Sequence, residues 1–173
     1  MTANVFNWKK LFWFCLGLAL ASTFCMKWIE DDFISNGKLF SIMDLELKLN
    51  KEGLIKIFGG MDNKARTVVD YHLHFDFFFM AGVFPCIAAI CMLIRERIEK
   101  KIVRSILFII AFLQLVAWSF DIYENLHLIK WMEDPSSIDK IEFYHILVRL
   151  KFILSLGGLA ISALSFLFFR SKK

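Results

Sequence analysis

Residues 105–129 read SILFIIAFLQLVAWSFDIYENLHLI, an apolar run that two acids interrupt near its end. A transmembrane helix needs about 20 mostly apolar residues to cross about 30 Å of hydrocarbon, so this run is long enough to span a membrane. Three further runs meet the same criterion, at about residues 11–28, 74–94 and 150–169. We therefore predict an all-α fold, an integral membrane four-helix bundle in which residues 1–173 form a single membrane domain.

The composition supports a membrane protein and argues against nucleic-acid binding. Of the 173 residues, 58% are hydrophobic, and they fall into blocks that charge clusters separate. The formal net charge is +4, but the basic residues sit beside the ends of the apolar blocks. They do not form the single stripe, interleaved with aromatics, that a nucleic-acid interface shows. The four cysteines lie inside apolar blocks without a C-x-x-C pair, which indicates buried apolar side chains.

Charge at the ends of the spans predicts their orientation. Lys and Arg are enriched on the cytoplasmic side of membrane proteins. Each span is bounded on one side by bases: Lys9, Lys10, Arg95, Arg97, Lys100, Lys101, Arg104, Arg170, Lys172 and Lys173. The two outward loops carry acids among fewer bases: Glu30, Asp31, Asp32, Glu133, Asp134 and Asp139. We expect a multi-pass protein of the cell membrane with N- and C-termini in the cytoplasm.

The first run also admits a second interpretation. Lys9 and Lys10, followed by an apolar stretch and Ala19-Leu20-Ala21, are typical of a signal peptide with its cleavage site. The apolar run continues to Trp28, however, which favours a retained span. A mature chain starting at Ser22 would have one span fewer.

The longest outward segment, about residues 30–70, follows the first span. Ser-Asn-Gly at 35–37 predicts a turn. Leucines that alternate with charged residues at 45–49 favour a short extended piece, and Asn50 is placed to cap a helix of about residues 51–58.

Asp62 then caps a long helix that enters the membrane as the second span. The segment before it is too small and too charged to bury a core of its own, so we expect it to lie on the outer membrane surface. On the fourth span, small residues recur three or four positions apart on one face, which favours close helix contacts in lipid: Ser155, Gly158, Ser162 and Ser165.

The ionisable residues of the spans lie at similar depths along their helices. At a rise of 1.5 Å per residue, Asp76, Asp121 and Arg149 lie about 25 to 31 Å above the cytoplasmic ends of their helices. Glu124 and Asn125 share this level, and they fall on the same helix face as Asp121 because steps of three, four or seven residues return to one face. Ionisable groups inside a span usually face the bundle interior. We therefore predict a polar pocket under the outer loops.

Ion pairing is the simplest role for these residues. Arg149 would neutralise Asp76, Asp121 or Glu124, since the guanidinium fork can serve two carboxylates at once. A purely structural role predicts that Arg149→Ala lowers the folded yield without a separable effect on any ligand.

A metal site is a second hypothesis. His72, Asp76, Glu124, His127 and His145 offer the nitrogen and oxygen ligands that zinc or iron accepts. A carboxylate beside a metal-bound water would permit hydrolysis of a lipid or peptide at the outer leaflet. No H-E-x-x-H motif accompanies these residues. Haem, with His72 or His127 as an axial ligand, is a further alternative.

The third hypothesis is a binding pocket for a lipid, quinone or other amphiphile. The polar residues would hold the head and the aromatic run would form the walls, with Phe75, Phe77, Phe78, Phe79 and Phe84. We favour a binding or interaction role, with membrane lipids, a second copy or another membrane protein as partner. A metal-dependent membrane enzyme is the alternative. No serine or cysteine has a histidine at a spacing that would pair with it, and no glycine-rich phosphate loop is present.

Overall fold

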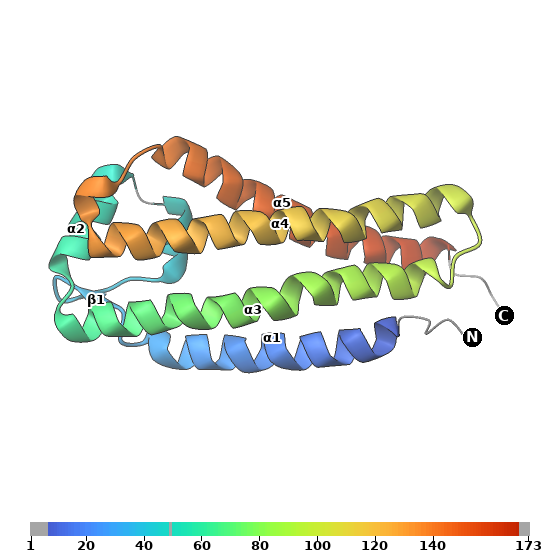
Figure 1. Cartoon of the computed structure of the whole chain (residues 1–173), viewed down its shortest axis with the longest axis horizontal. Helices are drawn as coiled ribbons and strands as arrows, with labels where there is room; N and C mark the ends of the chain where they lie inside the picture. Colours follow the sequence, from blue (N-terminus) through green and yellow to red (C-terminus); the bar gives the residue numbers. More distant parts are fainter. Residues whose placement is uncertain (1–6, 49, 170–173) are drawn as a thin grey trace, which may run out of the picture.

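Four long helices form the body of the molecule (Figure 1). The computed structural model describes residues 7–48 and 50–169, apart from the side chain of Lys48. The long helices are α1 (Trp8–Glu30), α3 (Asn63–Arg95), α4 (Lys101–Glu133) and α5 (Ile141–Phe169), and all four are long and apolar enough to cross a membrane. The predicted all-α four-helix bundle is confirmed, and the chain is a multi-pass membrane protein.

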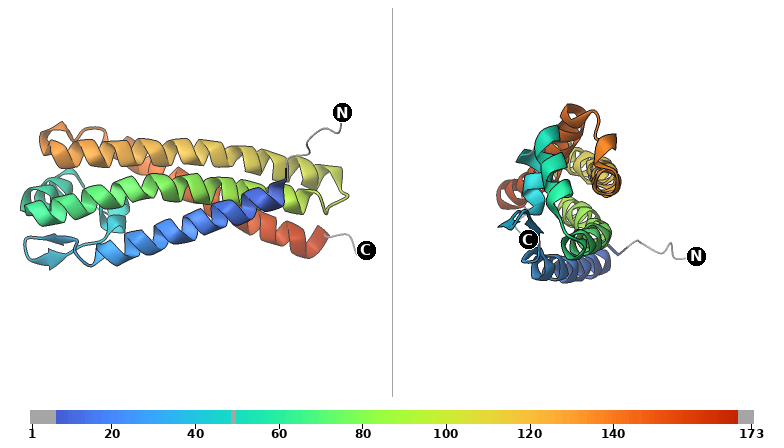
Figure 2. Two further views of the ribbon diagram at one scale, coloured as in Figure 1. Left: turned by 60° about the horizontal axis from the view of Figure 1, so that its bottom comes forward. Right: turned by 90° about the vertical axis from the view of Figure 1, so that its left-hand side faces the viewer.

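The long helices pack in sequence order around α3 and α4. α1 lies along α3, α3 lies along α4, and α5 packs on α4 and to a smaller extent on α3 (Figure 2). Gly82 lets α1 approach closely, since a Cβ at this position would lie 2.6 Å from the backbone nitrogen of Ala19. α1 and α5 both contact α3, but they do not pack along each other.

A two-residue hairpin follows α1. Strands β1 (Ile34–Ser35) and β2 (Lys38–Leu39) pair antiparallel. Asn36 and Gly37 at the tip have φ values of 51° and 71°, and two central residues with positive φ match the turn that suits the twist of a hairpin. The Ser35 hydroxyl donates to the Ile57 carbonyl at 2.8 Å, which fastens the hairpin to the next helix. The predicted turn is confirmed.

The caps expected in the outward segment are present. α2 (Lys51–Gly60) begins where the Asn50 side chain accepts from the Gly53 amide at 2.9 Å. α3 begins where Asp62 accepts from the Ala65 amide at 2.8 Å. Side-chain oxygens at these positions satisfy amides that the first helical turn leaves unpaired. Arg66 then donates to the Phe58 and Met132 carbonyls, which ties α2 to the end of α4.

The prediction of an extended piece at residues 45–49 is wrong for residues 45–48, and residue 49 lies outside the described residues. Asp44–Lys48 forms a π-helical turn, η1. The Ser41 amide donates to Asp44 Oδ2 at 2.9 Å, and the Asp44 amide donates back to Ser41 Oγ at 3.3 Å. This reciprocal pair is a capping box, and it starts a helical turn where the alternation of leucines alone favoured a strand.

The segment between α1 and α3 packs onto the ends of the long helices. Phe33, Leu45 and Phe58 are fully buried, in one cluster with Leu128 and Trp131 of α4. The segment lacks a core of its own, as expected, and it buries its apolar side chains against the ends of α3, α4 and α5 instead. This packing brings η1 into the interior, where it contributes to the candidate site.

Candidate functional site

A buried lysine on α5 is the centre of the polar cluster. Lys151 is 6% exposed. Its Nζ donates to Asp121 Oδ1 at 2.7 Å and lies 2.6 Å from Glu124 Oε2 and 3.8 Å from Glu46 Oε2. These carboxylates come from α4 and η1, so the lysine joins the last helix to two other parts of the chain.

The predicted face of α4 supplies most of the partners. Asp121, Glu124 and Asn125 are all buried. Asn125 Nδ2 donates to Asp76 Oδ2 at 2.7 Å and to the Leu73 carbonyl at 3.2 Å, so one amide links α4 to α3. The structure therefore brings together Asp76, Asp121, Glu124 and Asn125, four of the five residues predicted for the ligand-binding or ion-pair cluster.

The fifth residue, Arg149, is the exception. Arg149 is exposed, and Lys151 occupies the position in the cluster that was expected for it. Two residues correspond to a rotation of about 200° around a helix, so the two basic side chains point in nearly opposite directions. The buried face of α5 runs through Tyr144, Val148 and Lys151, in the same steps of four and three as the small residues further along the helix.

Sequence reasoning also missed Glu46. This acid was assigned to the outer surface, but η1 carries it into the bundle, where it is 6% exposed. Burial raises the pKa of the Glu46 carboxyl above its ordinary value, and the attraction of Lys151 opposes that shift only in part. The Ser-x-x-Asp capping pair indicates the helical turn, but not the packing that buries Glu46.

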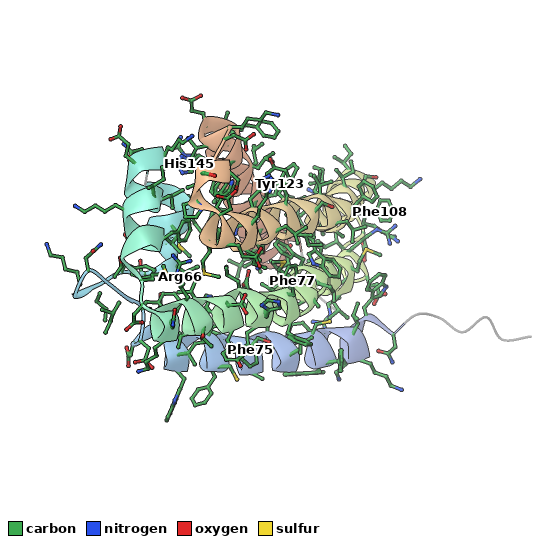
Figure 3. All side chains as sticks on the ribbon, turned by 60° about the vertical axis from the view of Figure 1, so that its left-hand side comes forward. Arg66, Phe75, Phe77, Phe108, Tyr123 and His145 are labelled. Carbon is green, nitrogen blue, oxygen red and sulfur yellow. The ribbon has the colours of Figure 1, made fainter. Side chains whose placement is uncertain are left out.

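The histidines do not join this cluster as a set. His127 stacks on Tyr123 at 3.9 Å between ring centroids, and His145 lies 5.6 Å from the Tyr144 ring. Figure 3 shows Tyr123 and His145 on the α4 and α5 side of the molecule, away from Phe75 on α3. Within residues 7–48 and 50–169, no three His, Cys, Asp or Glu side chains are grouped so that they could hold a metal ion.

The metal site expected from His72, Asp76, Glu124, His127 and His145 is thus not assembled. Spacing along single helices could not show that His127 turns toward an aromatic ring, with its Nδ1 2.8 Å from the Tyr123 carbonyl.

A cavity of about 310 Å³ extends from the polar cluster. α1, α3 and α5 form its walls and η1 borders one end. The polar lining contains Glu46, His72, Asp76, Asp121 and Lys151, whereas the walls are mostly apolar, with Phe79, Val83, Phe84, Ile87, Leu156 and Leu159.

Only part of the phenylalanine run faces this cavity. Phe79 and Phe84 line it. Phe75 and Phe78 are exposed, and Phe77 packs beside the cluster of Met80, Phe84 and Ala117. Consecutive residues on a helix point in different directions, so a run of aromatics cannot form a single wall.

No protein-family model, curated protein or solved structure matches the chain. Its function must therefore be argued from the geometry of the site.

Two buried polar atoms of the cavity lining lack a hydrogen-bond partner among the described residues. They are Glu46 Oε2 and His72 Nδ1. His72 is 5% exposed, and its ring contacts Phe33 edge-on at 5.1 Å between centroids. An unsatisfied buried polar group costs about 1 to 3 kcal/mol. A ligand that pairs with these atoms would recover that cost.

Proposed function

We propose that the protein binds an amphiphilic molecule in the cavity between α1, α3 and α5. The polar head lies beside Glu46, His72 and Asp76, and the hydrocarbon part lies along the apolar walls. The observation that carries the proposal is an apolar cavity that ends at buried polar atoms without partners. Ligand sites commonly combine apolar walls with a few convergent polar groups.

The arrangement of the helices supports access from the bilayer. α1 and α5 each line the cavity, and they do not pack along each other. An amphiphile could therefore pass between them without leaving the hydrocarbon layer. A role limited to ion pairing explains Lys151, Asp121 and Glu124, but it leaves the cavity and the unpaired atoms of Glu46 and His72 without a purpose.

A cavity-filling substitution tests the proposal. Ser155 lines the cavity and Ser119 is exposed on α4, and each hydroxyl donates to the carbonyl four residues earlier, at 2.6 Å and 2.9 Å. Ser155→Phe places an aromatic ring in the cavity, whereas Ser119→Phe places the same ring on the outer face of its helix and is the matched control.

The readout is native mass spectrometry of the full chain released from a gentle detergent. We expect an amphiphile to remain bound to the wild type and to Ser119→Phe, and to be absent from Ser155→Phe while that variant stays folded. Equal retention by both variants, or no retention by the wild type when amphiphiles are added, would refute a binding role.

We further propose that the protein lies in the cell membrane with both termini in the cytoplasm, which directs the polar cluster toward the outer side. α1 begins and α5 ends at the same end of the bundle as the α3–α4 connection (Figure 1). That connection is rich in bases, and cytoplasmic loops carry an excess of Lys and Arg.

Cysteine labelling tests this orientation. Ser136 and Glu96 are exposed, at opposite ends of the bundle. A membrane-impermeant thiol reagent applied to intact cells should label Ser136→Cys and should reach Glu96→Cys only after permeabilisation. The reverse pattern would show that the chain is inverted. The unsubstituted chain corrects for its four native cysteines.

A further inference from the structure

We infer that the head group is a primary ammonium carried on a hydrocarbon chain. This inference rests on the proposed amphiphile binding and goes one step further, because it names the chemical class of the ligand. It follows from the charges, the unpaired acceptors and the size of the cavity.

Acids outnumber bases in the buried cluster. The cluster contains Glu46, Asp121 and Glu124 around the ammonium of Lys151, and Asp76, which Asn125 links to the same face of α4. Lys151 is engaged at 2.7 Å and 2.6 Å by Asp121 and Glu124, whereas Glu46 is beyond hydrogen-bond distance at 3.8 Å. If all four acids ionised, the cluster would carry an uncompensated negative charge, and each buried ion without a partner costs several kcal/mol.

The two acids that have the weakest contacts with Lys151 line the cavity. Asp76 receives a hydrogen bond from the neutral amide of Asn125, and no cation lies within ion-pair distance of it among the described side chains. Glu46 Oε2 has no hydrogen-bond donor in the described part of the chain. Both line the cavity. A cation that entered there would meet Asp76, which has no counter-ion within ion-pair distance, and Glu46, whose contact with Lys151 is the longest of the three.

The number of donors also favours an ammonium. A primary ammonium has three N–H donors and no acceptor, so it can pair with Glu46 Oε2, with a carboxyl oxygen of Asp76 and with His72 Nδ1 in its acceptor tautomer. A hydroxyl head has one donor. A carboxylate head has none and would add a further negative charge beside the acids.

Lys27 does not make an anionic head group more favourable than an ammonium. It is the other lysine of the cavity lining, but its side chain is 70% exposed and already pairs with Glu30. An anion at Lys27 would lie at the mouth of the cavity, in a site that water screens.

The size of the cavity limits the rest of the ligand. About 310 Å³ is at the lower end of the range of about 300 to 1,000 Å³ for small-molecule sites. The cavity can take a small head and part of one chain, while the remainder of the chain extends between α1 and α5 into the bilayer.

The experiment compares three amphiphiles of equal chain length on the detergent-solubilised full chain at pH 7. Dodecylamine, dodecanol and dodecanoic acid are titrated by isothermal calorimetry, with Ser155→Phe as the blank that corrects for partition into micelles. We expect the Kd of dodecylamine to be at least about tenfold below that of dodecanol, since hydrogen bonds to charged groups are the stronger ones. Dodecanoic acid should bind more weakly than both.

Two substitutions that remove a carboxylate test whether the acids cause the preference for dodecylamine over dodecanol. Glu46→Gln and Asp76→Asn should each reduce the advantage of dodecylamine over dodecanol to about threefold or less, while the Kd of dodecanol stays within about twofold. Asp70→Asn is the matched control, because Asp70 is also an acid on α3 but is only half-buried, lies outside the cavity lining and pairs with His74. It should keep the wild-type preference.

The outcomes separate the two proposals. If none of the three amphiphiles binds, the proposed function and the ammonium both fail. If dodecanol binds in a manner that Ser155→Phe abolishes, but dodecylamine binds no more tightly, the cavity is a binding site and only the ammonium is refuted. An unchanged preference in both Glu46→Gln and Asp76→Asn would also refute it.

A primary ammonium also occurs in the head group of a two-chain lipid. A competition experiment therefore distinguishes a lipid from a single-chain amine. Phosphatidylethanolamine is added to the complex with dodecylamine. Displacement would assign the ammonium to a lipid head group, and continued binding of dodecylamine would assign it to a single-chain amine. Each result supports recognition of an ammonium.

Discussion

Replacement of Lys151 by methionine should destabilise the bundle strongly. Its ammonium lies 2.7 Å from Asp121 and 2.6 Å from Glu124, and the residue is 6% exposed. Removing one partner of a buried ion pair costs about 3 to 5 kcal/mol, because the other charge stays buried without compensation. For a chain of this size, about 2 to 4 °C of Tm corresponds to each kcal/mol, so we expect Lys151→Met to lower Tm by about 6 to 20 °C.

The assay is thermal unfolding in detergent, followed by tryptophan fluorescence. Arg149→Met is the control, because Arg149 is exposed on the same helix, and substitutions at such positions usually change stability by no more than about 0.5 kcal/mol. Combining Lys151→Met with Asp121→Asn and Glu124→Gln should restore at least half of the lost Tm, since the charges are then removed together. A larger loss for Arg149→Met than for Lys151→Met would refute the assignment of the cation.

Two further predictions concern η1 and the contact between α1 and α3. Burial raises the pKa of Glu46 above its ordinary 4.5, so the unfolded chain ionises first as pH rises, and the wild type loses stability above about that pH. The Tm of Glu46→Gln minus that of the wild type should therefore grow as pH rises from 4.5, and a difference that shrinks would contradict a raised pKa. Gly82→Ala should lower Tm because the added Cβ would meet the α1 backbone at 2.6 Å, whereas Gly157→Ala, with nothing within 4 Å, should leave Tm unchanged or raise it by the helix propensity of alanine. Equal effects of the two glycine substitutions would mean that α1 is not packed closely on α3.

Hydropathy was sufficient to predict the four spans, because each is a long apolar run and lipid requires internal pairing of the backbone. It located their ends less well. The apolar run of the second span begins at about residue 74, whereas α3 starts at Asn63, after the predicted Asp62 cap, because its first turns pack against the preceding segment and need no hydrocarbon. The caps at Asn50 and Asp62 were predictable because capping depends on residues that are close in sequence.

The candidate site was predictable where its residues share a helix face. Asp121, Glu124 and Asn125 follow from the helical repeat alone. Lys151 was missed because Arg149 stands at the level expected for a counter-ion, and depth along a helix does not determine the direction of a side chain. Continuing the small-residue face of α5 by steps of four and three would have reached Lys151.

Glu46 could not be predicted from the spans at all. Its position depends on the packing of Leu45 and Phe33 against residues of α3, α4 and α5, which are contacts between segments far apart in the sequence. The same limit applies to the histidines, whose ring directions depend on neighbouring aromatic side chains.

The placement of Lys151 has a consequence for how the protein is made. Glu46, Asp121 and Glu124 leave the ribosome before Lys151, which pairs with all three in the folded protein. These three acids thus lack their buried cation until α5 arrives. Assembly in the membrane is thereby coupled to completion of translation.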